Sequence, residues 1–224
     1  HGHAETLAAL KRRVKPFMMR RTKEIVAPEL PPRIEQTDIC PLTEPQAALY
    51  ADVLASVRED VYEAVRTKGF KRSQIVILSA LTKLRQVCNH PALVDKRSSR
   101  DQSVSGKMAY ALELAREAVE GGHKVLLFSQ FTSMLDLLRD ALDKIEIPHL
   151  TIEGKTKDRA TVVRQFKEAQ SGCVFLLSLR AAGTGLTLTE ADTVILYDPW
   201  WNPMVERQNP VLLKAESSGR RSCV

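Results

Sequence analysis

Two stretches in the first half of the chain carry apolar residues at the spacing of an amphipathic α-helix. The first stretch repeats one every four positions, at Leu49, Val53, Val57, Val61 and Val65. The second carries a similar stripe, at Ile77, Leu81, Leu84 and Cys88. Residues 67–72 between them contain Gly69 and three basic residues, so we predict a helical hairpin with a charged tip.

The segments that flank this hairpin lack a helical pattern. Prolines precede it and favour extended chain, because proline has no amide hydrogen for a helix to use: Pro28, Pro31, Pro32, Pro41 and Pro45. Residues 96–105 follow it and are polar and rich in serine. We expect them to be a linker to a second unit.

From Lys107 onward, short apolar runs alternate with amphipathic helical stretches. The runs are residues 125–128, 174–177 and 194–196, each bounded by polar or turn residues, as expected of strands buried on both faces. Stripes at helical spacing precede or separate them, and include Met108, Leu112, Leu135, Leu138, Val162 and Phe166. The alternation predicts an α/β fold with an open parallel sheet, in which ligands bind at the carboxyl ends of the strands.

Three segments follow these strands directly and are the expected place for function: residues 129–131, 178–185 and 198–203. Two glycines in the second segment would let a phosphate or sugar approach the backbone, and Arg180 offers a forked donor to the same groups. A tight strand-to-helix turn explains those glycines as well. The third segment holds adjacent tryptophans, which fit either the core or a platform on which bases stack.

One segment has the appearance of a phosphate-binding loop without its full pattern. Gly154, Lys155 and Thr156 match the end of that motif, but the position that needs the first glycine is His149. The chain also has no Asp-Glu pair for magnesium and water. The sequence therefore predicts that the chain alone lacks the parts that hold ATP phosphates and their metal.

Composition narrows the class of protein further. No apolar run reaches the roughly 18 residues that a membrane helix needs, and no signal segment is present, so we expect an intracellular protein that does not bind a membrane. Four cysteines without a C-x-x-C pair argue against a zinc site or a disulfide framework. Residues 1–100 hold 18 of the 33 basic residues but 11 of the 27 acidic ones. This excess fits a phosphate backbone, and it fits solvated helix faces equally well.

Several of these segments, taken in order, resemble the second, C-terminal motor lobe of the Snf2 family of DNA translocases and chromatin remodellers. The matching segments are residues 15–23, 84–91, 105–108, 124–131, 154–166 and 178–188. The resemblance covers residues 11–208. It implies a RecA-like parallel sheet flanked by helices and preceded by an α-helical protrusion. It also implies three parts: a basic N-terminal segment, protrusion and linker over 1–104, the lobe over 105–208, and a tail over 209–224.

The resemblance implies roles for particular residues at the strand ends. It suggests DNA contacts for seven of them, which are Ser129, Gln130, Phe131, Arg180, Ala181, Thr184 and Trp201. It suggests contact with a nucleotide held between two lobes for Gly183 and Gly185. A helix cap is the alternative for Gln130. The implied partners are double-stranded DNA and the N-terminal RecA-like lobe of the same parent protein, and ATP with Mg²⁺ would bind only when both lobes are present.

The sequence departs from the family after Gln208. The family continues into motif VI, with two arginines three residues apart, whereas residues 209–224 contain only the adjacent Arg220 and Arg221. We expect this tail to be irregular, and no catalytic residue is assigned in the chain. The functional alternatives are a motor lobe, a catalytically dead remnant that binds DNA or protein, and a small-molecule nucleotide enzyme. The last would need a Gly-x-Gly-x-x-Gly segment directly after a strand, and none of the predicted strands is followed by one. The expected location is the nucleoid in bacteria or the nucleus in eukaryotes.

Overall fold

The computed structural model describes residues 2–17, 35–179, 188–198 and 220–223. The chain divides into two compact units, residues 1–32 and residues 33–224. The first unit contains helix α1 (Gly2–Val14), followed by a short 3-10 helix, η1 (Lys15–Phe17). The predictions from sequence did not include this helix, whose last turn is basic.

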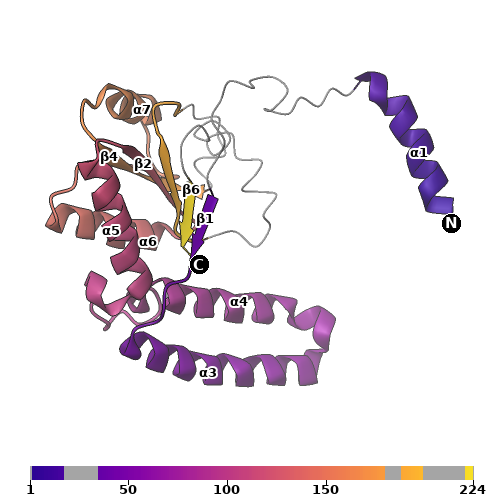
Figure 1. Ribbon diagram of the computed structural model, residues 1–224. Helices are drawn as coiled ribbons and strands as arrows, with labels where there is room; N and C mark the ends of the chain where they lie inside the picture. Colours follow the sequence, from indigo (N-terminus) through magenta and orange to yellow (C-terminus); the bar gives the residue numbers. More distant parts are fainter. Residues whose placement is uncertain (1, 18–34, 180–187, 199–219, 224) are drawn as a thin grey trace. The chain divides into compact units, whose positions relative to one another are not determined.

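The second unit begins with the helical hairpin that the periodic stripes predict. Helix α3 (Glu44–Lys68) starts with a capping box, in which the Thr43 hydroxyl accepts from the Gln46 amide. It ends at Gly69, whose φ of 75° lies in the region that glycine adopts most easily. Helix α4 (Phe70–Asn89) then returns alongside α3 (Figure 1). The hairpin and its tip are confirmed.

A six-stranded sheet forms the body of this unit. Its strands are β1 (Glu35–Asp38), β2 (Lys124–Ser129), β3 (His149–Ile152), β4 (Cys173–Ser178), β5 (Thr193–Leu196) and β6 (Arg220–Cys223). All neighbouring pairs are parallel, in the order β1-β6-β5-β2-β4-β3. The three predicted apolar runs are β2, β4 and β5, which lie together at the centre of the sheet.

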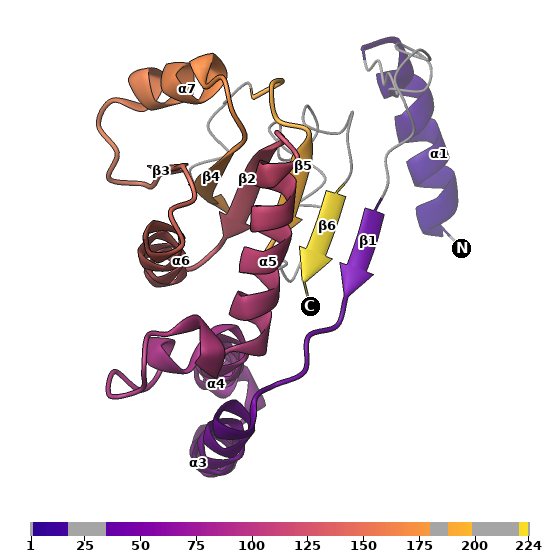
Figure 2. The ribbon, with the colours of Figure 1, turned by 60° about the vertical axis from the view of Figure 1, so that its left-hand side comes forward.

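Helices cover both faces of the sheet because alternate strand residues point to opposite sides. On one face, Val125, Leu127 and Ile195 pack in a core with α5 (Gly106–Glu120) and α6 (Thr132–Lys144). On the other, Leu126 and Phe175 pack with α7 (Arg159–Glu168) (Figure 2). This is the α/β, RecA-like fold that the sequence predicts. None of the described helices is long and apolar enough to span a membrane.

The prediction of an irregular tail is wrong for residues 220–223. These residues form β6, which pairs with β5 on one side and β1 on the other. An extended segment between two strands satisfies its backbone amide and carbonyl groups whatever its side chains are. The side-chain pattern therefore gave no sign of this strand. The sheet therefore includes strands from both sides of the predicted lobe boundaries at residues 105 and 208. Residues 209–219 lie outside the described part.

The segment predicted as a linker is held against the body. A short 3-10 helix, η2 (Pro91–Leu93), precedes it, and a second, η3 (Gln102–Val104), lies within it. The carbonyl of Val104 accepts from the Thr43 hydroxyl, and Arg100 forms an ion pair with Asp140 of α6 at 2.7 Å. The segment is therefore attached to the residue that caps α3 and to α6.

Candidate functional site

The carboxyl ends of β2 and β5 lie side by side and bring two of the predicted segments together. Phe128 is paired with Leu196 in the sheet, and the amide of Tyr197 extends the ladder by donating to the Phe128 carbonyl at 3.0 Å. Gln130 and Asp198 follow immediately on the two strands. The arrowheads of β1 and β6 point toward the hairpin in Figure 2, so this end of the sheet faces α4.

Asp198 accepts hydrogen bonds from both neighbouring segments. Its two carboxylate oxygens lie 3.1 and 3.2 Å from the backbone nitrogen of Gln130. The side-chain amide of Asn89, the last residue of α4, donates to Asp198 Oδ2 at 3.5 Å. We call the group of polar residues gathered here the junction cluster, and it consists of Arg85, Asn89, Ser105, Gln130, Tyr197 and Asp198.

Burial dominates the electrostatics of the junction cluster. Asp198 is 3% exposed, and this burial raises the pKa of its carboxyl group to about 6. Hydrogen bonds from Ser129 and Gln130 and the charge of Arg85 oppose that shift. Burial also lowers the pKa of Arg85, while the charge of Asp198 raises it. Because guanidinium groups stay protonated in proteins, the carboxyl group is the member that titrates near neutral pH.

Asn89 fastens the hairpin to the body through its backbone as well. Its carbonyl oxygen accepts from the Tyr197 hydroxyl at 2.7 Å and from the Ser105 hydroxyl at 2.8 Å. The Ser105 oxygen in turn accepts from the Met108 amide and so caps α5. The end of α4, the start of α5 and the end of β5 therefore meet at one buried residue.

The three predicted DNA contacts at the end of β2 lie in different environments. Ser129 is fully buried, and its hydroxyl accepts from the Phe131 amide at 3.1 Å, which disfavours a direct contact between its side chain and DNA. Phe131 is half-buried against the core beneath α5 and α6. Gln130 is half-buried as well, and its side-chain oxygen accepts from Arg85 at 3.4 Å.

The alternative role for Gln130, a helix cap, is not observed. Phe131 is the N-cap residue of α6, and no side chain caps that helix. Gln130 is therefore not a helix cap. Its side-chain nitrogen is buried and has no hydrogen-bond partner within the described part of the chain. The remaining predicted site residues lie outside the described residues, namely Arg180, Ala181, Gly183, Thr184, Gly185 and Trp201.

Sequence reasoning assigned no role to Arg85, Asn89 or Asp198. Arg85 and Asn89 lie in the segment 84–91 that resembles the family, and Asp198 follows a buried strand. A signal was present, since a carboxylate directly after a central parallel strand is well placed for function. The contacts among the three join positions more than 100 residues apart, such as Asn89 and Asp198, and no local pattern encodes them.

The segment that partly matches a phosphate-binding loop forms an ordinary turn after β3. The Thr156 hydroxyl accepts from the Glu153 amide at 2.9 Å, and Asp158 caps α7 by accepting from Thr161. Among the described residues, no group of three His, Cys, Asp or Glu could hold a metal ion.

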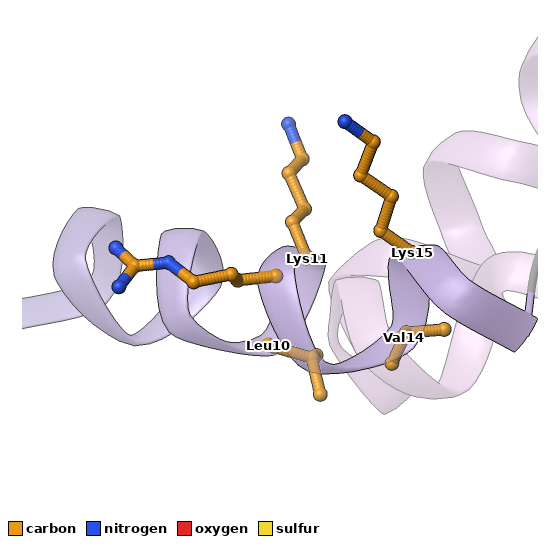
Figure 3. A pocket seen from close by; sticks show the side chains of 5 residues that line it. Leu10, Lys11, Val14 and Lys15 are labelled. Atoms are coloured by element: carbon orange, nitrogen blue, oxygen red, sulfur yellow. The ribbon is translucent and has the colours of Figure 1, made fainter.

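A shallow groove lies along α1 in the first unit and is lined by Leu10, Lys11, Arg12, Val14 and Lys15. Lys11 and Lys15 extend to the same side of the helix, whereas Leu10 and Val14 occupy another side (Figure 3). The groove has basic and apolar walls and no catalytic group. Its basic side chains belong to the positive excess of residues 1–100. They are equally consistent with binding a nucleic-acid phosphate backbone and with a helix face in contact with solvent.

Family comparisons match the two halves of the chain separately. A model described as SNF2-related domain matches residues 1–93, and one described as helicase conserved C-terminal domain matches residues 106–209. An uncharacterised ATP-dependent helicase of Mycoplasma genitalium is 35% identical over 213 residues, covering 91% of this chain and 19% of the relative. The transcription regulatory protein SNF2 of Saccharomyces cerevisiae is 32% identical and covers 91% of this chain and 13% of the relative.

Solved structures agree with this assignment. The C-terminal domain of the Sulfolobus solfataricus SWI2/SNF2 ATPase aligns with a TM-score of 0.69 and 33% identity, over 86% of this chain and 79% of that one. The core of the same ATPase in complex with double-stranded DNA aligns with a TM-score of 0.71 and 32% identity, over 97% of this chain and 46% of that one. This chain spans about a fifth of the length of three bacterial helicase relatives that it matches. The chain belongs to the Snf2 family of helicase-like proteins, within superfamily 2.

Proposed function

We propose that the chain is the second motor lobe of an ATP-dependent translocase that moves on double-stranded DNA. The observation that carries the proposal is its similarity, over 97% of its length, to an ATPase core solved with double-stranded DNA. The end of the sheet formed by β2 and β5 would face the DNA. In that position Gln130, Phe131, Arg180 and Trp201 would contact the backbone, as the family resemblance implies, together with Ala181 and Thr184.

The ATP site would be completed by an N-terminal RecA-like lobe. Gly183 and Gly185 would approach the nucleotide from this lobe, and the N-terminal lobe would supply the phosphate-binding loop and the acidic residue for Mg²⁺. Hydrolysis of ATP supplies the energy for movement, and this chain's own part is to bind DNA and to close on the nucleotide. Relatives include both bacterial helicases and a yeast nuclear protein, which favours a bacterial nucleoid or a nuclear location.

Binding to DNA is tested by the salt dependence of affinity. We expect Arg180→Ala to weaken binding of a labelled duplex about equally for all sequences, and to reduce the slope of log affinity against log salt by about 0.9. Arg116→Ala is the matched control. Arg116 is exposed near the end of α5, and this helix leads into the amino end of β2, away from the carboxyl end proposed to face DNA. A slope that Arg180→Ala leaves unchanged would contradict the phosphate contact.

Trp201 distinguishes a DNA-facing platform from core packing. If it lies against the DNA strand, Trp201→Ala should weaken DNA binding by roughly 1 to 3 kcal/mol and leave the melting temperature nearly unchanged. A core tryptophan would instead lose roughly 3 to 5 kcal/mol of stability. Thermal unfolding and fluorescence anisotropy on the same preparation separate the two.

A second candidate is a folded module that binds DNA or protein without a catalytic role. The tail favours it, because residues 209–224 lack the spaced arginine pair and residues 220–223 pair within the sheet. Both candidates predict no DNA-stimulated ATPase for this chain alone, since arginine fingers contribute roughly 10³ to 10⁵ in rate elsewhere. Restoration of ATPase activity by an added N-terminal lobe would favour the motor. Phosphate release by this chain alone that Arg180→Ala abolishes would contradict both candidates.

A further inference from the structure

Asp198 of the junction cluster places a carboxylate in a buried position, where an apolar side chain would lose less hydration free energy. A buried carboxylate loses its hydration, and only hydrogen bonds and opposite charge offset that loss. Asp198 receives the Gln130 backbone amide on both oxygens, the Asn89 side chain at 3.5 Å, and the nearby charge of Arg85. Its contacts go to the end of β2 with the turn that follows it and to the last two turns of α4, so its geometry suits a residue that holds these segments together.

We propose that Asp198 is a positioning residue for DNA binding, whose carboxylate holds the Gln130 turn against the last turn of α4 and thereby sets the turn's approach to the DNA backbone. This inference rests on the proposed function. Asp198 itself is buried and would not touch DNA. It acts through Gln130, whose side-chain oxygen already meets Arg85 from α4.

The ionised form of Asp198 is the one that can hold the turn fully. A carboxylate accepts on both oxygens, whereas a protonated carboxyl group places one hydrogen where a donor now points. Three titratable groups on neighbouring helices surround the site: Arg85 and Cys88 from α4 and Lys107 from α5. Burial raises the pKa of Cys88 and lowers that of Arg85, and neither group changes charge between pH 5 and 7. Asp198 is therefore the member expected to titrate in that interval.

The first test uses the whole 224-residue chain without DNA. We expect the amide proton of Gln130, followed by nuclear magnetic resonance, to shift with pH with a midpoint near that of Asp198. Asp198→Asn should abolish the shift. The matched control is Asp192→Asn, because Asp192 precedes the same strand at its opposite end and pairs with His123 at 2.7 Å. The same midpoint in Asp198→Asn, or no titration in the unmodified chain, would overturn the proposal.

The second test measures affinity for a duplex of fixed sequence. At pH 7.5 we expect Asp198→Asn to bind about three- to tenfold more weakly, the effect of misplacing one ordinary hydrogen bond. At pH 5 the unmodified chain should lose most of this advantage, because its own carboxyl group is then protonated. Asp192→Asn should keep full affinity at both pH values. Equal affinity of Asp198→Asn and the unmodified chain at pH 7.5 would contradict a positioning role.

The two tests separate this inference from the function on which it rests. An unmodified chain that binds no duplex contradicts the proposed function, while the Gln130 titration still decides whether Asp198 holds the turn. Should Asp198→Asn fail to fold, Asn89→Ala serves in its place. It removes one donor to Asp198 but keeps the backbone carbonyl that Tyr197 and Ser105 use. We expect it to move the Gln130 midpoint to higher pH, and an unchanged midpoint would count against the proposal.

Discussion

The sheet and the helical hairpin of the second unit are built in contrasting ways. Every residue of β4 is buried, and the sheet packs against helices on both faces. Over their 45 residues, α3 and α4 bury only three apolar side chains, Val57, Ala80 and Val87, and they leave large ones such as Ile75 and Leu78 exposed. Stability should therefore be concentrated in the sheet, and the hairpin should depend on its attachment at the junction cluster.

The largest expected effect comes from the centre of the sheet. Phe175 of β4 is fully buried, and its ring centroid lies 4.7 Å from that of Phe166. We expect Phe175→Ala to lower the free energy of unfolding by roughly 3 to 5 kcal/mol, since the cavity adds to the lost transfer energy. Urea denaturation measures it. A loss under about 1 kcal/mol would show that the sheet is no better packed than the hairpin.

The next effect belongs to the junction itself and depends on pH. The pKa of Asp198 rises from 3.8 to about 6 on folding, so the folded state binds the proton more tightly than the unfolded state. This contribution is favourable at low pH, and it is lost as the pH rises from about 4 to above 6, by roughly 3 kcal/mol.

Asp198→Asn isolates this contribution because the amide does not titrate. The unfolding free energy of the unmodified chain minus that of Asp198→Asn should fall by roughly 3 kcal/mol across that interval, when both are measured by denaturation at several pH values. Other carboxyl groups, such as Asp95 and Asp101, have pKa values lowered by hydrogen bonds and contribute with the opposite sign below pH 4. A difference that is flat with pH would mean that Asp198 is well solvated.

A smaller effect is expected inside the hairpin. Val57 of α3, the helix that packs against α4, is 5% exposed, and Val57→Ala removes two buried carbon atoms. We expect a loss of about 1.5 kcal/mol, at ~0.8 kcal/mol for each buried carbon. Hydrogen exchange should show that the loss is confined to α3 and α4. Equal deprotection of β2 and β4 would indicate that hairpin and sheet unfold as one.

The smallest effect is expected on the outer side of α4. Ile75 is 80% exposed, so Ile75→Ser should change the unfolding free energy by no more than about 0.5 kcal/mol. Chemical denaturation alongside Val57→Ala provides the comparison. A loss as large as that of Val57→Ala would show that Ile75 is covered in the folded protein.

Sequence reasoning was most successful where one local pattern decides the structure. The stripes from Leu49 to Val65 predicted α3, and the continuous apolar runs predicted β2, β4 and β5. It failed for β6, whose residues Arg220–Cys223 carry no strand pattern and gain their form from two neighbouring strands. It also missed the buried contacts of Asp198, because the partners of a buried carboxylate are known only once α4 and β2 are placed beside β5.

The position of β6 sets an order for assembling the sheet during synthesis. β1 is an edge strand whose neighbour is β6, and Glu35 pairs with Arg220 at the other end of the chain. A ribosome makes residues 35–38 before residues 220–223, so β1 cannot pair with β6 until the later segment has emerged. The α3–α4 pair needs only its own neighbours in sequence, and such local contacts form fastest. The β1 segment therefore stays without its strand neighbour until residues 220–223 have been made.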